Sequence, residues 1–296
     1  PRRDPAGPLL EQPPPPAAVL AQGLLLTADP SGYVLFVIPS ILVSIAITPI
    51  LLSISPTPAF ETTKPMSLKE LAGYSPLGCV GMFLLGGVFS AQFGMAPVYG
   101  TQAGLSVAQI SVFVAMFFVG SVILQYPIGW ISDRMDRRFL ILIVSAIGAA
   151  GSVLGMLLGG SYVLLLAAAF VVGGMSNPLY SLLIAHTNDF LEHEDMAAAS
   201  GGLIFINGLG AILGPIITGY MMDVVGPGGF FLFTAVLLVL LASYAGYRTT
   251  QRKAIPVEDT GAYVAVAPSY TSVALEYAQE YAIESEKEDE TAIRSG

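Results

Sequence analysis

Apolar residues fill most of this chain in long stretches that contain no Asp, Glu, Lys or Arg. One such stretch covers residues 71–132 and another covers residues 139–188. A bilayer core needs about 20 apolar residues per spanning helix, so each stretch is long enough for two or more spans. The pattern therefore predicts an all-α fold, a polytopic transmembrane helical bundle.

Polar turns divide the apolar stretches into seven expected spans. The predicted spans are residues 33–53, 77–99, 107–130, 139–159, 162–187, 197–222 and 229–247. Between the first two, residues 54–76 form a polar linker, in which Ser67 and Glu70 have the spacing of a capping box. This spacing predicts a short surface helix in the linker.

The two ends of the chain differ from the spans. Residues 1–32 are rich in proline, and the chain begins with Pro1 rather than Met, so we expect a truncated N-terminal segment. Residues 248–296 are acidic and lack long apolar runs, which is typical of a disordered tail.

The basic residues are distributed unevenly among the connections between spans. Ten of the twelve lie on one side of the predicted membrane: Lys64, Lys69, Arg134, Arg137, Arg138, Arg248, Arg252, Lys253, Lys287 and Arg294. Connections that carry Lys and Arg face the cytoplasm. We therefore expect a multi-pass protein of the plasma membrane, which for a bacterial protein is the inner membrane, with the linker and the C-terminus in the cytoplasm.

Composition narrows the classes of function. Charged residues make up 11% of the chain, against about 25% in soluble domains. The net charge of -9 comes mainly from the two ends, and no basic face suited to nucleic acid is present. The single Cys79 excludes an internal disulfide and a multi-cysteine metal site. We expect the lipid bilayer as a partner, and no nucleic acid, metal or cofactor.

A charged turn between two predicted spans is the main candidate for chemistry. Its candidate residues are Gly129, Asp133, Arg134, Arg137 and Arg138. The next connection on the same predicted side carries carboxylates that the arginines can reach: Asp189, Glu192 and Asp195. Ion pairs between the two connections must break before that side of the bundle opens, so we predict a conformational latch. The alternative is a basic loop that only sets topology.

This turn resembles motif A of the major facilitator superfamily, Gly-x-x-x-Asp-Arg-x-Gly-Arg-Arg/Lys, with Asp136 where the family usually has Gly. Residues 210–219 also resemble the Gly-x-x-x-Gly-Pro-x-x-Gly pattern of antiporters. The candidates for a helix hinge or packing notch are Gly210, Gly214, Pro215 and Gly219. Residues 133–138 and 178–189 further resemble the YcaD-like branch of uncharacterised bacterial transporters.

The resemblance implies a fold and an activity. Residues 33–53 correspond to helix 6 of the superfamily, residues 54–76 to the central cytoplasmic linker, and residues 77–247 to the six helices of the C-terminal half, a 3+3 inverted repeat. It implies a secondary active transporter that moves a small organic solute by alternating access. It also implies that an N-terminal half of the same transporter is missing here and is a partner.

No charged residue lies at the middle of a predicted span, so the candidates for substrate contact are neutral. In the superfamily, helices 7, 8, 10 and 11 line the cavity, and the mid-span residues on helices 7, 10 and 11 are Gln92, Phe93, Asn177, Tyr180 and Asn207. Hydrogen bonding across helices is the alternative role of the polar members.

Two further classes of function were weighed. Seven spans are compatible with a seven-helix receptor or sensor. A membrane-embedded enzyme is disfavoured, because the chain has no His-Glu-x-x-His, no Gly-x-Ser-x-Gly and no intramembrane Asp pair. We expect the protein not to be an enzyme.

Overall fold

The computed structural model describes Val37, residues 40–41, 44–45 and 66–251, and Tyr263. The chain divides into two units, residues 1–62 and residues 63–296. In the first unit, the described positions are helical and exposed. They belong to the predicted span 33–53, whose other residues lie outside the described ranges, as do residues 1–32, most of the linker and, except for Tyr263, the tail beyond Gln251.

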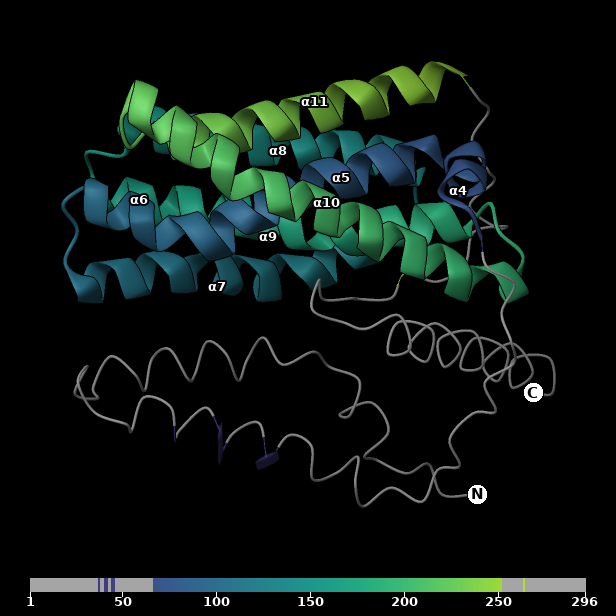
Figure 1. Cartoon of the computed structure of the whole chain (residues 1–296), viewed down its shortest axis with the longest axis horizontal. Coiled ribbons are helices and arrows are strands. Elements are labelled where there is room, and N and C mark those ends of the chain that lie inside the picture. Colours follow the sequence, from purple (N-terminus) through teal and green to yellow (C-terminus); the bar gives the residue numbers. More distant parts are fainter. Residues whose placement is uncertain (1–36, 38–39, 42–43, 46–65, 252–262, 264–296) are drawn as a thin grey trace. The chain divides into compact units, whose positions relative to one another are not determined.

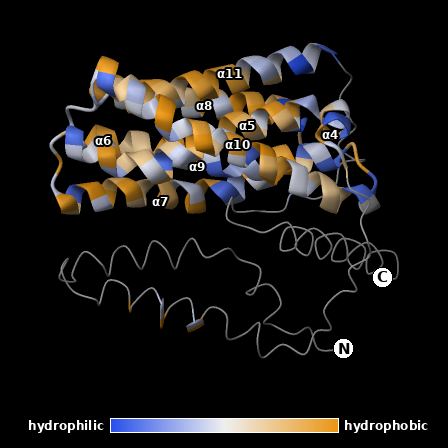
Figure 2. Ribbon diagram, in the orientation of Figure 1, coloured by the Kyte–Doolittle hydropathy of each residue, from blue (hydrophilic) through white to orange (hydrophobic). Residues whose placement is uncertain are grey.

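The second unit contains six helices that are long and apolar enough to cross a membrane, as predicted. They are Pro76–Gln102, α7 (Val107–Ser132), α8 (Arg137–Leu158), α9 (Tyr162–Asn188), α10 (His193–Val225) and α11 (Gly229–Gln251). Every regular element in the described ranges is helical (Figure 1). Hydrophobic residues dominate these helices, while hydrophilic ones gather near helix ends and on α4 (Figure 2).

The helix boundaries follow local capping chemistry. The predicted surface helix is α4 (Leu68–Tyr74), and both hydrogen bonds of its capping box are present, with the Ser67 N–H donating to Glu70 Oε2 at 2.8 Å. These hydrogen bonds lower the pKa of Glu70. Ser106 and Gln109 form a second capping box at the start of α7.

The first long span is not one regular helix. It consists of α5 (Pro76–Ser90), the π-helical turn η1 (Ala91–Met95) and α6 (Ala96–Gln102). A π-helical turn inserts an extra residue per turn and occurs often at functional sites. Gln92 and Phe93, two predicted cavity residues, lie within this turn.

The helices pair in a pattern that an inverted repeat produces. The main pairs are α5 with α10, α7 with α9, α8 with α9, α5 with α11, and α8 with α11. Exchanging α5 with α9, α7 with α10 and α8 with α11 turns this set into itself. These five most extensive pairs therefore agree with the predicted 3+3 inverted repeat, while α10 packs against α11 more extensively than α7 packs against α8.

Glycines line both principal crossings of the repeat. A Cβ at Gly210 on α10 would overlap the carbonyl oxygen of Phe83 on α5, and a Cβ at Gly86 would overlap that of Asn207. Gly120 and Gly173 have the same relation at the crossing of α7 with α9. Small residues allow helix backbones to approach closely in lipid, and here each crossing has a glycine on both helices.

Candidate functional site

The charged turn joins α7 to α8 at one end of the bundle. We call this the basic end; it also contains α4 and residues 189–192 between α9 and α10. α7 ends at Ser132, Asp133 follows as its C-cap, and α8 begins at Arg137. The turn is short because Asp136 caps α8, its carboxylate accepting the Arg138 N–H at 3.0 Å.

Arg137 is buried at the centre of the basic end, with 3% of its surface exposed. Its Nη1 donates to Asp189 Oδ1 at the end of α9, and the Asp189 side chain is 4% exposed. Its Nε donates to Ser132 Oγ at 3.2 Å. Arg137 therefore links the turn between α7 and α8 to the connection between α9 and α10, as the latch prediction requires.

Arg138 is also buried, and it pairs locally. Its Nε and Nη2 donate to the two carboxylate oxygens of Asp136 at 3.2 and 2.9 Å. Burial raises the pKa of Asp136, but the hydrogen bonds and charge of Arg138 outweigh burial and lower it. Asp136, which departs from the family motif, thus serves both as the helix cap and as the counterion of Arg138.

Arg134 differs from the other two arginines because it is exposed. Its guanidinium lies 4.0 Å from the ring centroid of Trp130, and its Nη1 donates to the Trp130 carbonyl at 2.9 Å. This cation–π contact holds Arg134 against the end of α7. Arg134 makes no ion pair with another described residue.

Asp133 has a partner that sequence reasoning did not identify. Its Oδ1 accepts the backbone N–H of Tyr263 at 2.9 Å. The same oxygen lies 3.7 Å from Arg137 Nη2. The Tyr263 ring lies over Gly129, where an added Cβ would be 2.6 Å from both Cδ1 and Cε1.

The predicted acidic partners of the latch behave differently from one another. Asp189 pairs with Arg137. Glu192 is exposed at the start of α10, and Asp195 donates its backbone N–H to the Glu192 carbonyl at 3.0 Å. Within the described part of the chain, neither Glu192 nor Asp195 forms an ion pair with the three arginines. Their role in the latch stays a prediction.

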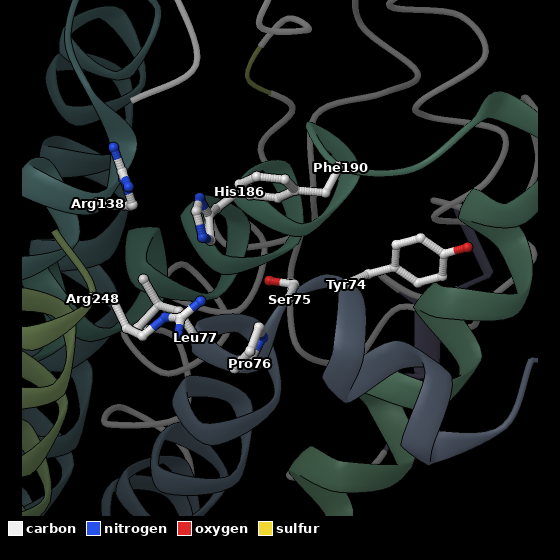
Figure 3. A pocket seen from close by; sticks show the side chains of 8 residues that line it. All are labelled: Tyr74, Ser75, Pro76, Leu77, Arg138, His186, Phe190 and Arg248. Carbon is white, nitrogen blue, oxygen red and sulfur yellow. The ribbon is translucent and has the colours of Figure 1, made fainter. Parts of the chain in front are cut away.

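A small pocket beside the latch is lined by residues from five helices and is shown in Figure 3. Its polar members are Arg138 of α8, His186 of α9, Arg248 of α11 and Ser75, the N-cap of α5. The space that it encloses admits about one water molecule. It is therefore too small for an organic solute. Among the described residues, no group of three His, Cys, Asp or Glu is placed to hold a metal ion.

The predicted cavity residues are mostly engaged in packing within this half. Gln92 is fully buried and donates to Ser176 Oγ at 2.8 Å; Asn207 donates to the Met82 carbonyl at 3.0 Å. Asn177 donates to the Gly173 carbonyl of its own helix at 3.2 Å, and Tyr180 is 1% exposed. These contacts fit the alternative role, hydrogen bonding and packing within the bundle.

Phe93 is the exposed member of that set, with 41% of its surface accessible. Its ring stacks between Phe89, with centroids 5.7 Å apart, and Phe118 of α7, at 5.3 Å. Phe89 also contacts Tyr180 at 6.0 Å. The structure thus joins two of the predicted cavity residues, Phe93 and Tyr180, in one row of aromatic rings.

The hinge candidates on α10 lie along its contact with the first span. Gly210 meets the backbone of α5, and a Cβ at Gly214 would overlap Ser90 Oγ. Pro215 lies inside the helix, and Gly219 has only the Met95 side chain near its missing Cβ, at 3.8 Å. Gly210 and Gly214 thus act as packing notches, while bending at Pro215 stays a prediction.

Comparison with known proteins gives concordant results. The family model described as Major Facilitator Superfamily matches residues 78–275. The chain is 30% identical over 148 residues to the uncharacterised MFS-type transporter YfkF of Bacillus subtilis, covering 49% of this chain and 37% of that protein. It is 26% identical over 175 residues to the uncharacterised MFS-type transporter YcaD of Escherichia coli, covering 58% and 45%. The chain therefore spans less than half the length of these relatives.

Proposed function

The chain belongs to the major facilitator superfamily as a multi-pass membrane protein, and from this premise we propose that it forms the C-terminal half of a secondary active transporter. The whole transporter moves a small organic solute across the bacterial inner membrane by alternating access. The buried pair of Arg137 and Asp189 carries this proposal. It ties the connection between α7 and α8 to the connection between α9 and α10. Rearranging these helix ends, as the half rocks against its partner half to open the basic end, therefore requires that the pair break.

A buried ion pair is a reasonable switch element. Desolvating two charges offsets much of their attraction, so such a pair adds little net stability compared with apolar residues. Breaking it while both charges stay buried is costly, whereas exposing both to water restores their hydration. The pair therefore favours two end states, one with the charges paired and dry and one with them separated and wet.

The orientation of the half follows from charge. The basic end carries Arg134, Arg137 and Arg138, while the connections at the opposite end, residues 103–106, 159–161 and 226–228, hold no Lys or Arg. We place the basic end and the C-terminus in the cytoplasm. In this orientation the latch closes the cytoplasmic side of the transport pathway.

The least buried helices of the half offer the surface on which we propose that the N-terminal half docks. α7 and α10 bury the smallest share of their apolar windows. α10 exposes a series of large apolar side chains: Phe205, Leu209, Ile212, Leu213, Ile216, Ile217 and Tyr220. In our proposal the N-terminal half of the transporter covers part of these two faces, and lipid covers the rest.

The solute contacts are proposed at the aromatic row that includes Phe93 and Tyr180. Aromatic rings offer apolar area and stacking, which suit a solute with a flat apolar part. Gln92, Asn177 and Asn207 are available only if the α5–α10 and α7–α9 crossings shift during transport. A bend at Pro215, flanked by Gly214 and Gly219, would permit such a shift.

Labelling of single cysteines in the full-length protein tests the alternating-access proposal. Gln125→Cys reports on the basic half of α7, and Thr101→Cys reports on the opposite end of the first span. In the Arg137→Gln background, a membrane-impermeant maleimide is expected to label Gln125→Cys faster and Thr101→Cys more slowly. A rise at both ends indicates general loosening and contradicts the proposal.

The receptor alternative is not favoured. The relatives that match are named as transporters, and the family match covers the six helices of the second unit. The same relatives favour a transporter over an enzyme. We therefore propose no second function.

A further inference from the structure

Tyr263 contacts the latch turn through three parts of the residue. Its backbone N–H donates to Asp133 Oδ1 at 2.9 Å. Its ring lies over Gly129 and packs against the main hydrophobic cluster of the half. Its hydroxyl is buried and makes no hydrogen bond of standard geometry in the described part of the chain. A residue beyond the end of α11 is thus seated on the turn between α7 and α8.

The place where the Tyr263 ring packs on α7, which we call the seat, requires glycine at position 129. A Cβ at Gly129 would be 2.6 Å from two ring carbons of Tyr263, which is closer than atoms pack. In membrane helices a small residue usually admits a neighbouring helix. At Gly129 the space admits the Tyr263 ring instead.

The seat is also connected to two helices and to the latch. Burial raises the pKa of the Tyr263 hydroxyl, while Ser181 on α9 and Gln125 on α7 lie close enough to act on it in the opposite direction. Asp133 receives the Tyr263 N–H and also lies 3.7 Å from Arg137. Moving Tyr263 therefore changes the environment of the carboxylate beside the latch arginine.

We propose that Tyr263 is a clasp that docks on the latch turn and holds the basic end closed. The docking surface consists of Gly129, Asp133, Gln125 and Ser181, and its occupant is Tyr263 of the same chain. Release of the clasp frees the Asp133 carboxylate and uncovers Ser181, which is 1% exposed. This inference goes beyond transport itself, because it assigns Tyr263 a regulatory contact.

The test uses Ser181→Cys in the full-length protein, with Cys79 replaced by Ala, and measures the rate of labelling by a membrane-impermeant maleimide in inside-out vesicles. Tyr263→Ala is expected to raise the labelling rate about fivefold. This factor corresponds to the burial free energy that is lost when a half-buried aromatic side chain is removed. Tyr263→Phe keeps the ring that fills the seat, so its rate is expected to match the parent. Tyr247→Ala, which removes an exposed tyrosine of α11, is the matched control and leaves the rate unchanged.

A second variant reaches the clasp from the other side of the contact. Gly129→Ala is expected to expel the ring and raise the labelling rate as Tyr263→Ala does. In the double variant, which combines Gly129→Ala with Tyr263→Ala, the added methyl group contacts no ring. The labelling rate is therefore expected to equal that of Tyr263→Ala alone. An unchanged rate in Tyr263→Ala, or full additivity in the double variant, overturns the clasp. The Thr101→Cys reporter lies at the opposite end of the first span, away from Tyr263. Its slower labelling in Arg137→Gln therefore judges alternating access separately from the clasp.

Discussion

Removing one partner of the buried Arg137–Asp189 pair should destabilise the protein far more than removing an exposed charge nearby. The side chains of Arg137 and Asp189 are 2% and 4% exposed, so neither can recover its hydration without movement. Loss of one partner from a buried pair costs about 3–5 kcal/mol. Asp189→Asn should fall at the lower end of that range, because Arg137 keeps the Ser132 hydroxyl and the Asp133 carboxylate at 3.7 Å.

The assay is thermal unfolding of the full-length protein in detergent, followed by loss of the monodisperse species. A loss of about 3 kcal/mol lowers Tm by about 6–12 °C for a domain of this size. Arg134→Gln is the matched control, since it removes an exposed arginine of the same turn with a cation–π contact worth about 1 kcal/mol or less.

A double-mutant cycle isolates the interaction between the two side chains. Arg137→Gln combined with Asp189→Asn leaves no unpaired buried charge, so the double variant should be more stable than the sum of the single losses by about 1–3 kcal/mol. The reasoning is refuted if the double loss equals the sum, or if Asp189→Asn shifts Tm no more than Arg134→Gln.

Two further predictions concern other contacts. Gly210→Ala should lower Tm by several degrees, because a Cβ there overlaps the Phe83 carbonyl oxygen on α5. Gly208→Ala should leave Tm unchanged, because nothing lies within 4 Å of its Cβ. Equal Tm values for the two variants would contradict the close approach of α10 to α5 at Gly210. The pKa of Asp136 is lowered in the folded protein, so its carboxylate stabilises the fold above its ordinary value of 3.8 and loses that contribution as pH falls through the lower folded value. The stability difference between the parent and Asp136→Asn should therefore shrink as pH falls below about 4. A difference independent of pH would show that the carboxylate charge does not stabilise the fold.

The helical architecture was predictable because the signals that define it are local. Charge-free length fixed the six spans of the second unit to within a few residues of their ends. The spacing of Ser67 and Glu70 predicted α4, whose capping box is present. The spacing of the charged turn predicted that an arginine reaches the next connection on the same side, and Arg137 contacts Asp189.

Other features depend on contacts that no short pattern encodes. The π-helical turn at Ala91–Met95 divides a span that was predicted as one helix. Arg137 pairs with Asp189 rather than with Glu192 or Asp195. The reason is where α9 ends, since Asp189 is the C-cap of that helix and its carboxylate contacts Arg137.

Two partners in the site were overlooked. Asp136 immediately precedes a helix, and that position favours an Asp cap, so this signal was available. Tyr263 lies beyond the last predicted span, where no sequence motif marks a contact with the bundle. Its seat over Gly129 could be found only from the three-dimensional arrangement.

The pairing of α5 with α10 has a consequence for how the protein is made. α5 emerges from the ribosome well before α10. Its glycine-lined face therefore has no packing partner, and the Met82 carbonyl has no hydrogen bond from Asn207, until α10 is made. During synthesis the early helix must therefore reside in lipid, or against the translocon, with its final neighbour absent. The order of translation thus makes α10 the helix whose insertion completes this crossing. Substitutions at its glycines should impair biogenesis even where the finished protein could tolerate them.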